Sequence, residues 1–361
     1  MSELIKNLPQ SHKPLRQKIN LYLKAIILGC KFHKKPIIKS PNFAPSIKVF
    51  ETMLSRRNIR VKVMQTLYAL DSMSGSVKPG EPISILTKKI EQSKYLFTYL
   101  IYFITETARY AETDANNKAS KHLPTAEDLA TNTKIAGNEL LWKIVEDVSF
   151  KATINELKAV HIIDKELLKK IYRILTATPE YKDYIELQAR DNRSEKKMLE
   201  FIFTDLLLPN EDFINHIEEH FINWDDDAEM MHSLVISYLN KPGQQNFQDF
   251  LSKEKRDFAK DLLNTVLDKT EHSLELIKPK LKNWDADRIA ALDLILLQMG
   301  VCEFLYFETI PTKVTINEYI DLAKAYSTPQ SGQFVNGLLD NIHKELQTEN
   351  KLEKVNFKER K

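Results

Sequence analysis

The chain has 361 residues, enough for two or three domains with sizeable cores. Glycine is scarce, at 8 residues, and the long segments lack the valine- and threonine-rich alternation of strands, so the composition predicts an all-α fold. The two cysteines, Cys30 and Cys302, lie far apart, which argues against a structural zinc site and fits a reducing, cytoplasmic location. The sequence has no run of 18 apolar residues, so no membrane span is expected.

The small net charge of +2 hides an uneven distribution. Residues 1–50 contain ten lysines or arginines and one acid, Glu3, whereas the remaining residues contain 42 basic and 49 acidic side chains. We interpret residues 1–52 as a basic N-terminal extension, either a flexible arm or sequence upstream of a start at Met53. Because residues 51–361 carry more acidic than basic side chains, they are not expected to bind polyanions in general. Any nucleic-acid contact has to come from a local basic patch.

Three arginines stand at the beginning of the first predicted helix, in the stretch LSRRNIRVKVMQTLYAL at residues 54–70. Ser55 has the position of an N-cap, and the apolar residues that follow recur at helical spacing. Arg56, Arg57 and Arg60 share one narrow arc of this helix, which turns apolar one turn later. Cations at a helix N-terminus oppose the macrodipole by about 0.3–1 kcal/mol each, which suggests that an anion binds there.

Residues 53–74 are predicted to form the first helix of one domain, and residues 75–250 a helical insertion into it. The stretch SGSVKPGE at 74–81 ends the first helix. Further helices are expected at 83–109, 127–148, 154–176, 179–190, 193–208, 210–222 and 227–240, with a polar interruption after the first of them. The sequence NWDDD at residue 223 recurs as NWDAD at residue 283, which fits either a diverged repeat or a chance match.

The last third of the chain predicts four helices and a charged tail. The helices are expected at 253–278, 286–307, 311–326 and 331–347, within a domain at 251–347 that the tail at 348–361 follows. The second is so apolar that it is expected to be the core. Thr315 and Glu318 have capping-box spacing, and Pro311 is an alternative start for the third helix.

The arginine-rich stretch RRNIRVKVMQTLYAL, together with IPTKVTINEYIDLAK and QFVNGLLDNI, resembles the NusB transcription antitermination family. The resemblance covers residues 54–73 and 253–346, about a third of the chain. It implies a NusB-like helical bundle interrupted by a large helical insertion. It also implies a bacterial RNA-binding protein without catalytic activity or a cofactor.

The resemblance further implies partners and site residues. The partners are ribosomal protein NusE, boxA-type RNA of ribosomal RNA transcripts, and the RNA polymerase elongation complex with other Nus factors, whose processive elongation the protein would promote. By position, Arg56, Arg57 and Arg60 match the family's RNA-contacting helix start. The residues that match its second RNA-facing segment are Gln330, Gln333, Phe334 and Asn336. Glu303 lies on the helix that usually faces NusE.

The chemistry of these residues agrees with single-stranded RNA, which requires cations for phosphates, a stacking surface, and amides that reach base edges. Gly337 lies inside a helix, where glycine costs about 1 kcal/mol relative to alanine, so a backbone, side chain or nucleotide is expected to approach closely. Simpler interpretations remain open. The arginines also fit a solvated helix end, and Phe334 with Leu338 and Ile342 fits a core stripe.

Two other classes of function are kept as alternatives. The sequence HIEEH at 216–220 fits a zinc hydrolase in which His216 and His220 hold Zn²⁺ and Glu219 activates water, with Glu271 or Glu275 as third ligand. Surface histidines are the simpler interpretation. The other alternative is a helical scaffold in which the insertion binds a protein and RNA binding is lost. A nucleotide-binding methyltransferase is disfavoured because no glycine-rich turn follows a strand.

Overall fold

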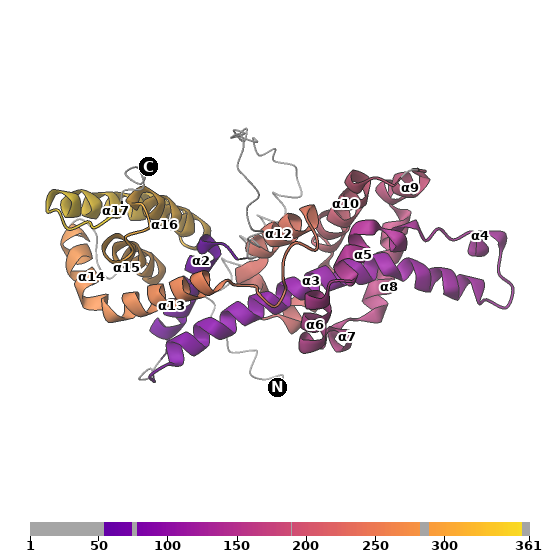
Figure 1. The fold of residues 1–361 in the computed structure, drawn as a ribbon, viewed down its shortest axis with the longest axis horizontal. Coiled ribbons are helices and arrows are strands. Elements are labelled where there is room, and N and C mark those ends of the chain that lie inside the picture. Colours follow the sequence, from indigo (N-terminus) through magenta and orange to yellow (C-terminus); the bar gives the residue numbers. More distant parts are fainter. Residues whose placement is uncertain (1–53, 74–77, 189, 282–288, 356–361) are drawn as a thin grey trace, which may run out of the picture. The chain divides into compact units, whose positions relative to one another are not determined.

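In the computed structural model of the chain, the described residues are 54–73, 78–188, 190–281 and 289–355. Every regular element within these ranges is a helix (Figure 1), which confirms the all-α prediction. The described residues form two compact units. We call residues 54–91 and 251–355 the α15 unit, and residues 92–250 the α12 unit. Helix α3 (Glu81–Ala119) contributes to both, and the domain boundaries expected above stay a prediction.

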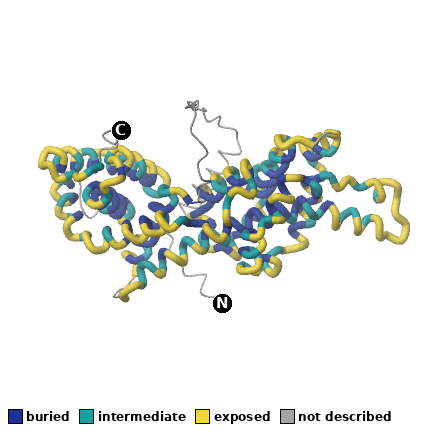
Figure 2. Tube along the Cα trace, in the orientation of Figure 1, coloured by how far each residue is buried: buried dark blue, intermediate teal, exposed yellow. Residues whose placement is uncertain are grey.

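The α15 unit has a single helix at its centre. Its elements are α2 (Arg56–Asp71), the beginning of α3, α13 (Lys253–Asp268), α14 (Thr270–Ile277), the short 3₁₀ helix η5 (Lys278–Leu281), α15 (Ala291–Tyr306), α16 (Thr312–Tyr326) and α17 (Ser331–Thr348). Helix α15 packs against α2, α13, α14, α16 and α17. It is buried along most of its length (Figure 2), which confirms that this very apolar helix is the core.

The predicted N-cap of α2 is confirmed. The Ser55 hydroxyl accepts a hydrogen bond from the backbone N–H of Asn58 at 3.2 Å, and the Asn58 side chain accepts one from the Ser55 N–H at 2.9 Å. One face of the helix then buries Ile59, Val63 and Leu67, each worth about 1.5–3 kcal/mol of transfer free energy. The cap fixes where α2 begins, and the buried face fixes its rotation.

Several helix boundaries differ from the sequence prediction; the single helix expected at 253–278, for example, is divided at Lys269 into α13 and α14, whereas the expected start of α16 at Pro311 is confirmed. Helix α3 continues through the polar stretch after residue 109 to Ala119, because a polar sequence without proline or glycine does not by itself end a helix. Helix α16 begins after its N-cap Pro311, so Thr315 is an interior residue and no capping box forms with Glu318. The Thr315 hydroxyl instead donates to the Glu303 carboxylate at 3.0 Å. The expected helix start at 286 lies outside the described residues.

The α12 unit contains the rest of α3 and shorter helices. These are α4 (Ala126–Leu129), the 3₁₀ helix η3 (Lys134–Gly137), α5 (Glu139–Val145), α6 (Val148–Leu157), α7 (Ala159–Ile162), α8 (Lys165–Ala177), α9 (Pro179–Glu186), α10 (Asn192–Phe201), the π-helical turn η4 (Ile202–Leu207), α11 (Glu211–His220) and α12 (Trp224–Asn240). An aromatic cluster forms part of its core. The rings of Phe97 and Phe247 stack with centroids 5.5 Å apart, and Tyr238 meets Phe97 edge to face at 5.8 Å.

The HIEEH histidines make internal contacts. His216 is buried, and its Nε2 lies 2.6 Å from the Tyr99 hydroxyl, while His220 Nδ1 bonds to the His216 carbonyl oxygen. Burial raises the pKa of Tyr99, so its hydroxyl stays protonated and forms a hydrogen bond with Nε2 in which the imidazole tautomer decides the donor. Among the described residues, no group of three or more histidine, cysteine, aspartate or glutamate side chains is placed to hold a metal ion. The zinc-hydrolase alternative therefore gains no support.

The Tyr99–His216 contact predicts an acid-sensitive α12 unit. Burial, reinforced by His220, lowers the pKa of His216 from its ordinary 6.5, so the unfolded chain takes up a proton more readily than the folded one. The stabilisation is complete above about pH 6.5 and is lost as the pH falls through that value toward the folded-state pKa. We expect thermal unfolding of the wild type to shift to lower temperature between pH 7.5 and pH 5.5.

Two variants separate His216 from the other titrating groups. His216→Phe keeps a ring beside Tyr99 and Phe103, and it should reduce the pH dependence between these two pH values to the part that comes from groups such as His232, whose pKa burial also lowers. His272→Gln, at a half-exposed position, is the matched control and should keep the wild-type slope. An unchanged slope in His216→Phe would contradict the assignment.

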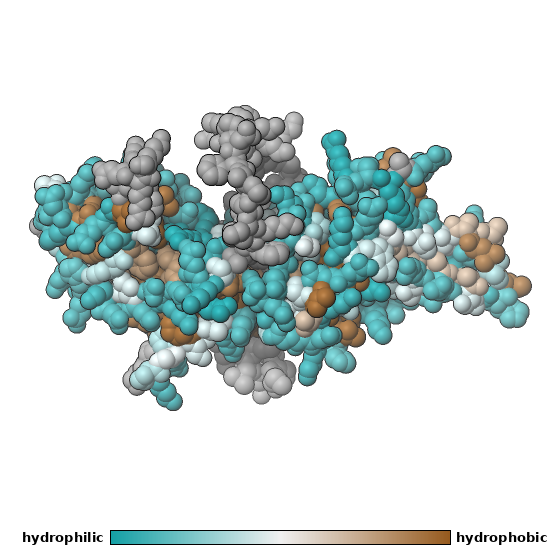
Figure 3. All heavy atoms as spheres, viewed as in Figure 1, coloured by the Kyte–Doolittle hydropathy of each residue, from teal (hydrophilic) through white to brown (hydrophobic). Residues whose placement is uncertain are grey.

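None of the helices in the described ranges combines the length and apolar character needed to cross a bilayer. On the face shown in Figure 3, hydrophilic side chains cover most of the described surface. Most of the large apolar side chains of the described residues are buried in the cores of the two units.

Candidate nucleic-acid interface

Arg60 lies inside the α15 unit, where it pairs with a second buried charge. Its Nε donates to Glu303 Oε1 at 2.6 Å and a terminal nitrogen to Oε2 at 3.1 Å, so the pair is bidentate. The two side chains are 3% and 0% exposed. The guanidinium also lies over the rings of Phe258 and Tyr319, at 5.6 and 5.9 Å from their centroids. This contact joins α2 to α15.

Two hydroxyl groups of α16 complete the environment of Glu303. Thr315 and Tyr319 each donate to one of its carboxylate oxygens at 3.0 Å. Burial alone would lower the pKa of Arg60, but the hydrogen bonds and charge of Glu303 outweigh it and raise that pKa. Burial and the neighbouring carboxylate also raise the pKa of Tyr319. Helices α2, α15 and α16 are therefore held by one buried, hydrogen-bonded ion pair.

This geometry changes the roles expected for two residues. Arg60 is 2% exposed, so it has almost no surface with which to contact RNA. Glu303 is completely buried among its own partners and offers no direct contact to another protein. Arg60 is instead a positioning residue, because it fixes the helix turn that carries Arg56 and Arg57.

Arg56 and Arg57 reach the surface one turn before Arg60. Their side chains are 40% and 41% exposed. Arg56 pairs with Glu254 at 2.6 Å, and Arg57 lies 3.4 Å from Asp321. Exposed pairs of this kind contribute about 0–1 kcal/mol, so a phosphate can displace either carboxylate. Both arginines are available to an anion, in competition with acids of the protein itself.

Helix α16 connects Arg57 with the beginning of α17. Lys324 lies one turn after Asp321, with its Nζ 4.0 Å from that carboxylate. A Cβ built on Gly332 would lie only 2.7 Å from Lys324 Cγ, so the first turn of α17 packs directly on the lysine stem. Arg57, Asp321, Lys324 and Gly332 thus form one continuous run of contacts from α2 to α17.

The turn before α17 is fixed by hydroxyl groups. The Ser331 hydroxyl donates to Asp293 Oδ2 on α15 at 2.6 Å and accepts from the Thr328 N–H at 3.2 Å. Ser331 itself is buried. These bonds fix the backbone at the beginning of α17 relative to α15.

The amide residues expected from the sequence lie at the beginning of α17. Gln330, Gln333 and Asn336 are exposed, whereas Phe334 is half-buried. Leu338 and Ile342, one and two turns later on the same face, are buried, so Phe334 lies at the edge of the core stripe that the simpler interpretation predicted. The α15 unit accordingly presents two surface arginines and three amides, joined by the end of α16.

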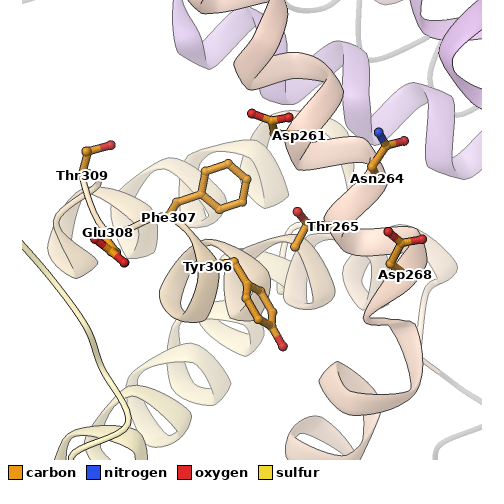
Figure 4. A pocket seen from close by; sticks show the side chains of 8 residues that line it. All are labelled: Asp261, Asn264, Thr265, Asp268, Tyr306, Phe307, Glu308 and Thr309. Carbon is orange, nitrogen blue, oxygen red and sulfur yellow. The ribbon is translucent and has the colours of Figure 1, made fainter.

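A depression of about 460 Å³ lies elsewhere on the α15 unit, where α13 faces the end of α15 (Figure 4). The residues that line it are Asp261, Asn264, Thr265, Asp268, Tyr306, Phe307, Glu308 and Thr309. Its charged groups are three carboxylates, and the Tyr306 ring is 41% exposed. Lys269 Nζ lies over the Tyr306 ring, 5.7 Å from its centroid, so a cationic side chain of another molecule would bind mainly through the three carboxylates.

The C-terminal segment supports the same end of α15. Lys354 Nζ donates to the carbonyl oxygens of Glu303 and Phe307 at 2.8 and 2.7 Å, and the Val355 N–H donates to the Glu308 carbonyl at 3.1 Å. These carbonyls lie at the negative end of the helix dipole. Burial lowers the pKa of Lys354 to about 8. The loop that follows α15 and lines the depression is therefore held by hydrogen bonds from Lys354 and Val355.

Comparison with known proteins identifies the family. Residues 214–344 match the NusB family. The transcription antitermination protein NusB of Salinibacter ruber is 40% identical over 132 residues, which are 36% of this chain and 76% of that protein. That of Finegoldia magna is 40% identical over 118 residues, or 30% of this chain and 86% of that protein. The chain belongs to the NusB family. No solved structure matches it.

The NusB match leaves most of the α12 unit outside it. The matched range begins in α11 and continues through α17. Residues 92–250 contain 18 basic and 27 acidic side chains, an excess of negative charge that disfavours nucleic-acid binding by this unit. The candidate RNA-contacting residues of this NusB-family chain therefore all lie in the α15 unit.

Sequence reasoning missed the acids that face the arginines. Glu254 and Asp321 are 198 and 264 residues away from the arginines with which they pair. Neither has a sequence signal of its own, because an acid on an amphipathic helix usually faces solvent. The depression between α13 and α15 was missed for the same reason, since its two walls are formed by separate helices.

Proposed function

We propose that this NusB-family protein is a transcription antitermination factor that binds boxA-type RNA together with ribosomal protein NusE. It would promote processive elongation by RNA polymerase, in association with other Nus factors and without catalysing a reaction. The observation that carries the proposal is the continuous surface from Arg57 through α16 to Gln333, because it combines cations with amides.

Each group has a defined role in the proposed complex. The guanidinium groups of Arg56 and Arg57 bind phosphates, for which they exchange their contacts with Glu254 and Asp321. Gln330, Gln333 and Asn336 donate to and accept from the edges of unpaired bases, and the exposed edge of Phe334 provides apolar contact. Because acids of the protein compete with the phosphates, binding to RNA by this protein alone should be weak and salt-dependent.

We assign the NusE surface to the depression between α13 and α15. Glu303 is buried, and α15 reaches the surface beside this depression at its C-terminal end, where Tyr306 is exposed. The carboxylates of Asp261, Asp268 and Glu308 would receive a lysine or arginine side chain of the partner. This surface differs from the one proposed for RNA, so both partners can bind together.

The central experiment titrates labelled boxA-type RNA with purified protein at several salt concentrations. We expect Arg57→Glu to weaken binding at least about tenfold and to reduce the salt slope by about 1, because a phosphate contact becomes a repulsion. Asp321→Asn should act in the opposite direction and tighten binding, because it removes the nearer of the two acids that compete for Arg57, at 3.4 Å against 4.0 Å for Glu318.

Two controls make this result specific. Lys165→Glu changes the net charge as much as Arg57→Glu does, but on an exposed position of α8, and should leave RNA affinity unchanged. Adding NusE should tighten RNA binding, and Asp268→Lys should abolish only that gain. If Arg57→Glu retains wild-type affinity and salt slope, RNA is not bound at this surface.

A further inference from the structure

Gly337 is an interior glycine of α17 for which the described chain gives no internal reason. Glycine is the least favourable helix-interior residue apart from proline. A positive φ does not explain it, since the glycines with that conformation among the described residues are Gly80 and Gly243. Packing does not explain it either, because no described atom lies within 4 Å of a Cβ built at this position.

Two other glycines of the α15 unit are required by close packing, unlike Gly337. A Cβ on Gly300 would lie 2.8 Å from Leu339 Cδ2, and one on Gly332 would lie 2.7 Å from Lys324 Cγ. Both glycines are buried. Gly337, in contrast, is exposed. Within the described residues, therefore, no contact accounts for the missing side chain, and the surface at this position is open to a ligand.

The exposed face of α17 shows what could approach. Gln333 precedes Gly337 by one turn and Asn341 follows it by one turn, so all three lie on the same face. The two amides are separated by about 12 Å along the helix axis, with no side chain at Gly337 between them. The nearby acid, Asp340, is paired with Lys344 at 2.6 Å. We call the gap between Gln333 and Asn341 the bare turn.

We propose that the bare turn admits the ribose-phosphate backbone of the bound RNA against the backbone of α17. This inference rests on the proposed RNA-binding function and extends its surface from Gln333 to Asn341. RNA is favoured over a protein segment because the face is polar, carries adaptable amides and continues the surface that begins at Arg57. Any side chain at residue 337 would hold the ribose away and loosen the contacts of both amides.

The test is a graded series, Gly337→Ala and Gly337→Leu, measured by RNA titration and by thermal unfolding. Both substitutions improve helix propensity, so the variants should unfold at a higher temperature than the wild type. RNA binding should nevertheless weaken several-fold for alanine and at least about tenfold for leucine. The salt slope should stay at the wild-type value, because no phosphate-binding cation is removed.

The matched control is Gln347→Leu, which adds an apolar side chain at another exposed position of α17 and should leave RNA binding unchanged. If the Gly337 series binds RNA normally while Arg57→Glu is impaired, the inference is overturned and the proposed function stands. If neither is impaired, both are overturned. Loss of NusE binding with intact RNA binding would assign the bare turn to the protein partner and would also overturn the inference.

Discussion

Replacing Arg60 by methionine is expected to lower the free energy of unfolding of the α15 unit by about 3–5 kcal/mol. The reason is that the Glu303 carboxylate would remain completely buried with hydrogen bonds from the Thr315 and Tyr319 hydroxyl groups but without its cation, and Glu318 would lose the guanidinium nitrogen 3.5 Å from it. Denaturant unfolding followed by circular dichroism measures the loss. Hydrogen exchange of α15 peptides should localise it to this unit.

The matched control is Arg57→Met, which removes a half-exposed cation from the same helix and should cost no more than about 1 kcal/mol. The double variant Arg60→Met/Glu303→Leu should recover part of the loss, because it removes the unpaired buried charge and leaves only the two hydroxyl groups without an acceptor. Equal losses for Arg60→Met and Arg57→Met would contradict a structural role for the buried pair.

The second large effect is expected at Gly300 of α15, which packs against the Leu339 side chain of α17. Gly300→Val should destabilise the α15 unit by at least about 2 kcal/mol, because even its Cβ would lie 2.8 and 3.1 Å from the two terminal carbons of Leu339 and 3.4 Å from the Tyr319 ring. Leu339 and Tyr319 are both 0% exposed, so neither can move aside into solvent. Thermal unfolding compared with the wild type measures this loss.

The same substitution at Gly337 provides the control. Gly337→Val adds the same atoms to an exposed helix position with no described atom near its Cβ, so it should be neutral or slightly stabilising. Leu339→Ala should couple to Gly300→Val, so the double variant should lose less than the sum of the single losses. Additive losses would show that the contact with Leu339 is not what excludes a side chain.

Local sequence signals predicted the elements that carry the site. The hydroxyl of Ser55 and the apolar spacing after it were sufficient to place the N-cap of α2, because a cap and a buried face act within a few residues of each other. Polar composition was a poorer guide for α3, which continues ten residues beyond the predicted end. Its sequence weakens helical amphipathicity there without introducing a residue that stops a helix.

The sequence predicted which residue types form the candidate site, but it did not predict which of them are exposed. Gln330, Gln333 and Asn336 are exposed, as binding to RNA would require. Arg56, Arg57 and Arg60 looked equivalent in the sequence, yet only the first two reach the surface. A guanidinium is buried only where a carboxylate meets it, and Glu303 lies 243 residues along the chain from Arg60.

The sequence by itself determined that this protein is helical, that it belongs with NusB, and that α2 begins with a cluster of cations. Only the tertiary structure decided that Arg60 and Glu303 form an internal support, that Glu254 and Asp321 face the outer arginines, and that nothing in the described chain fills the space at Gly337. The physical reason is the sequence separation over which each interaction acts. Capping and helical periodicity act over one or two turns, whereas the burial of a charge depends on a partner that the fold alone brings into contact.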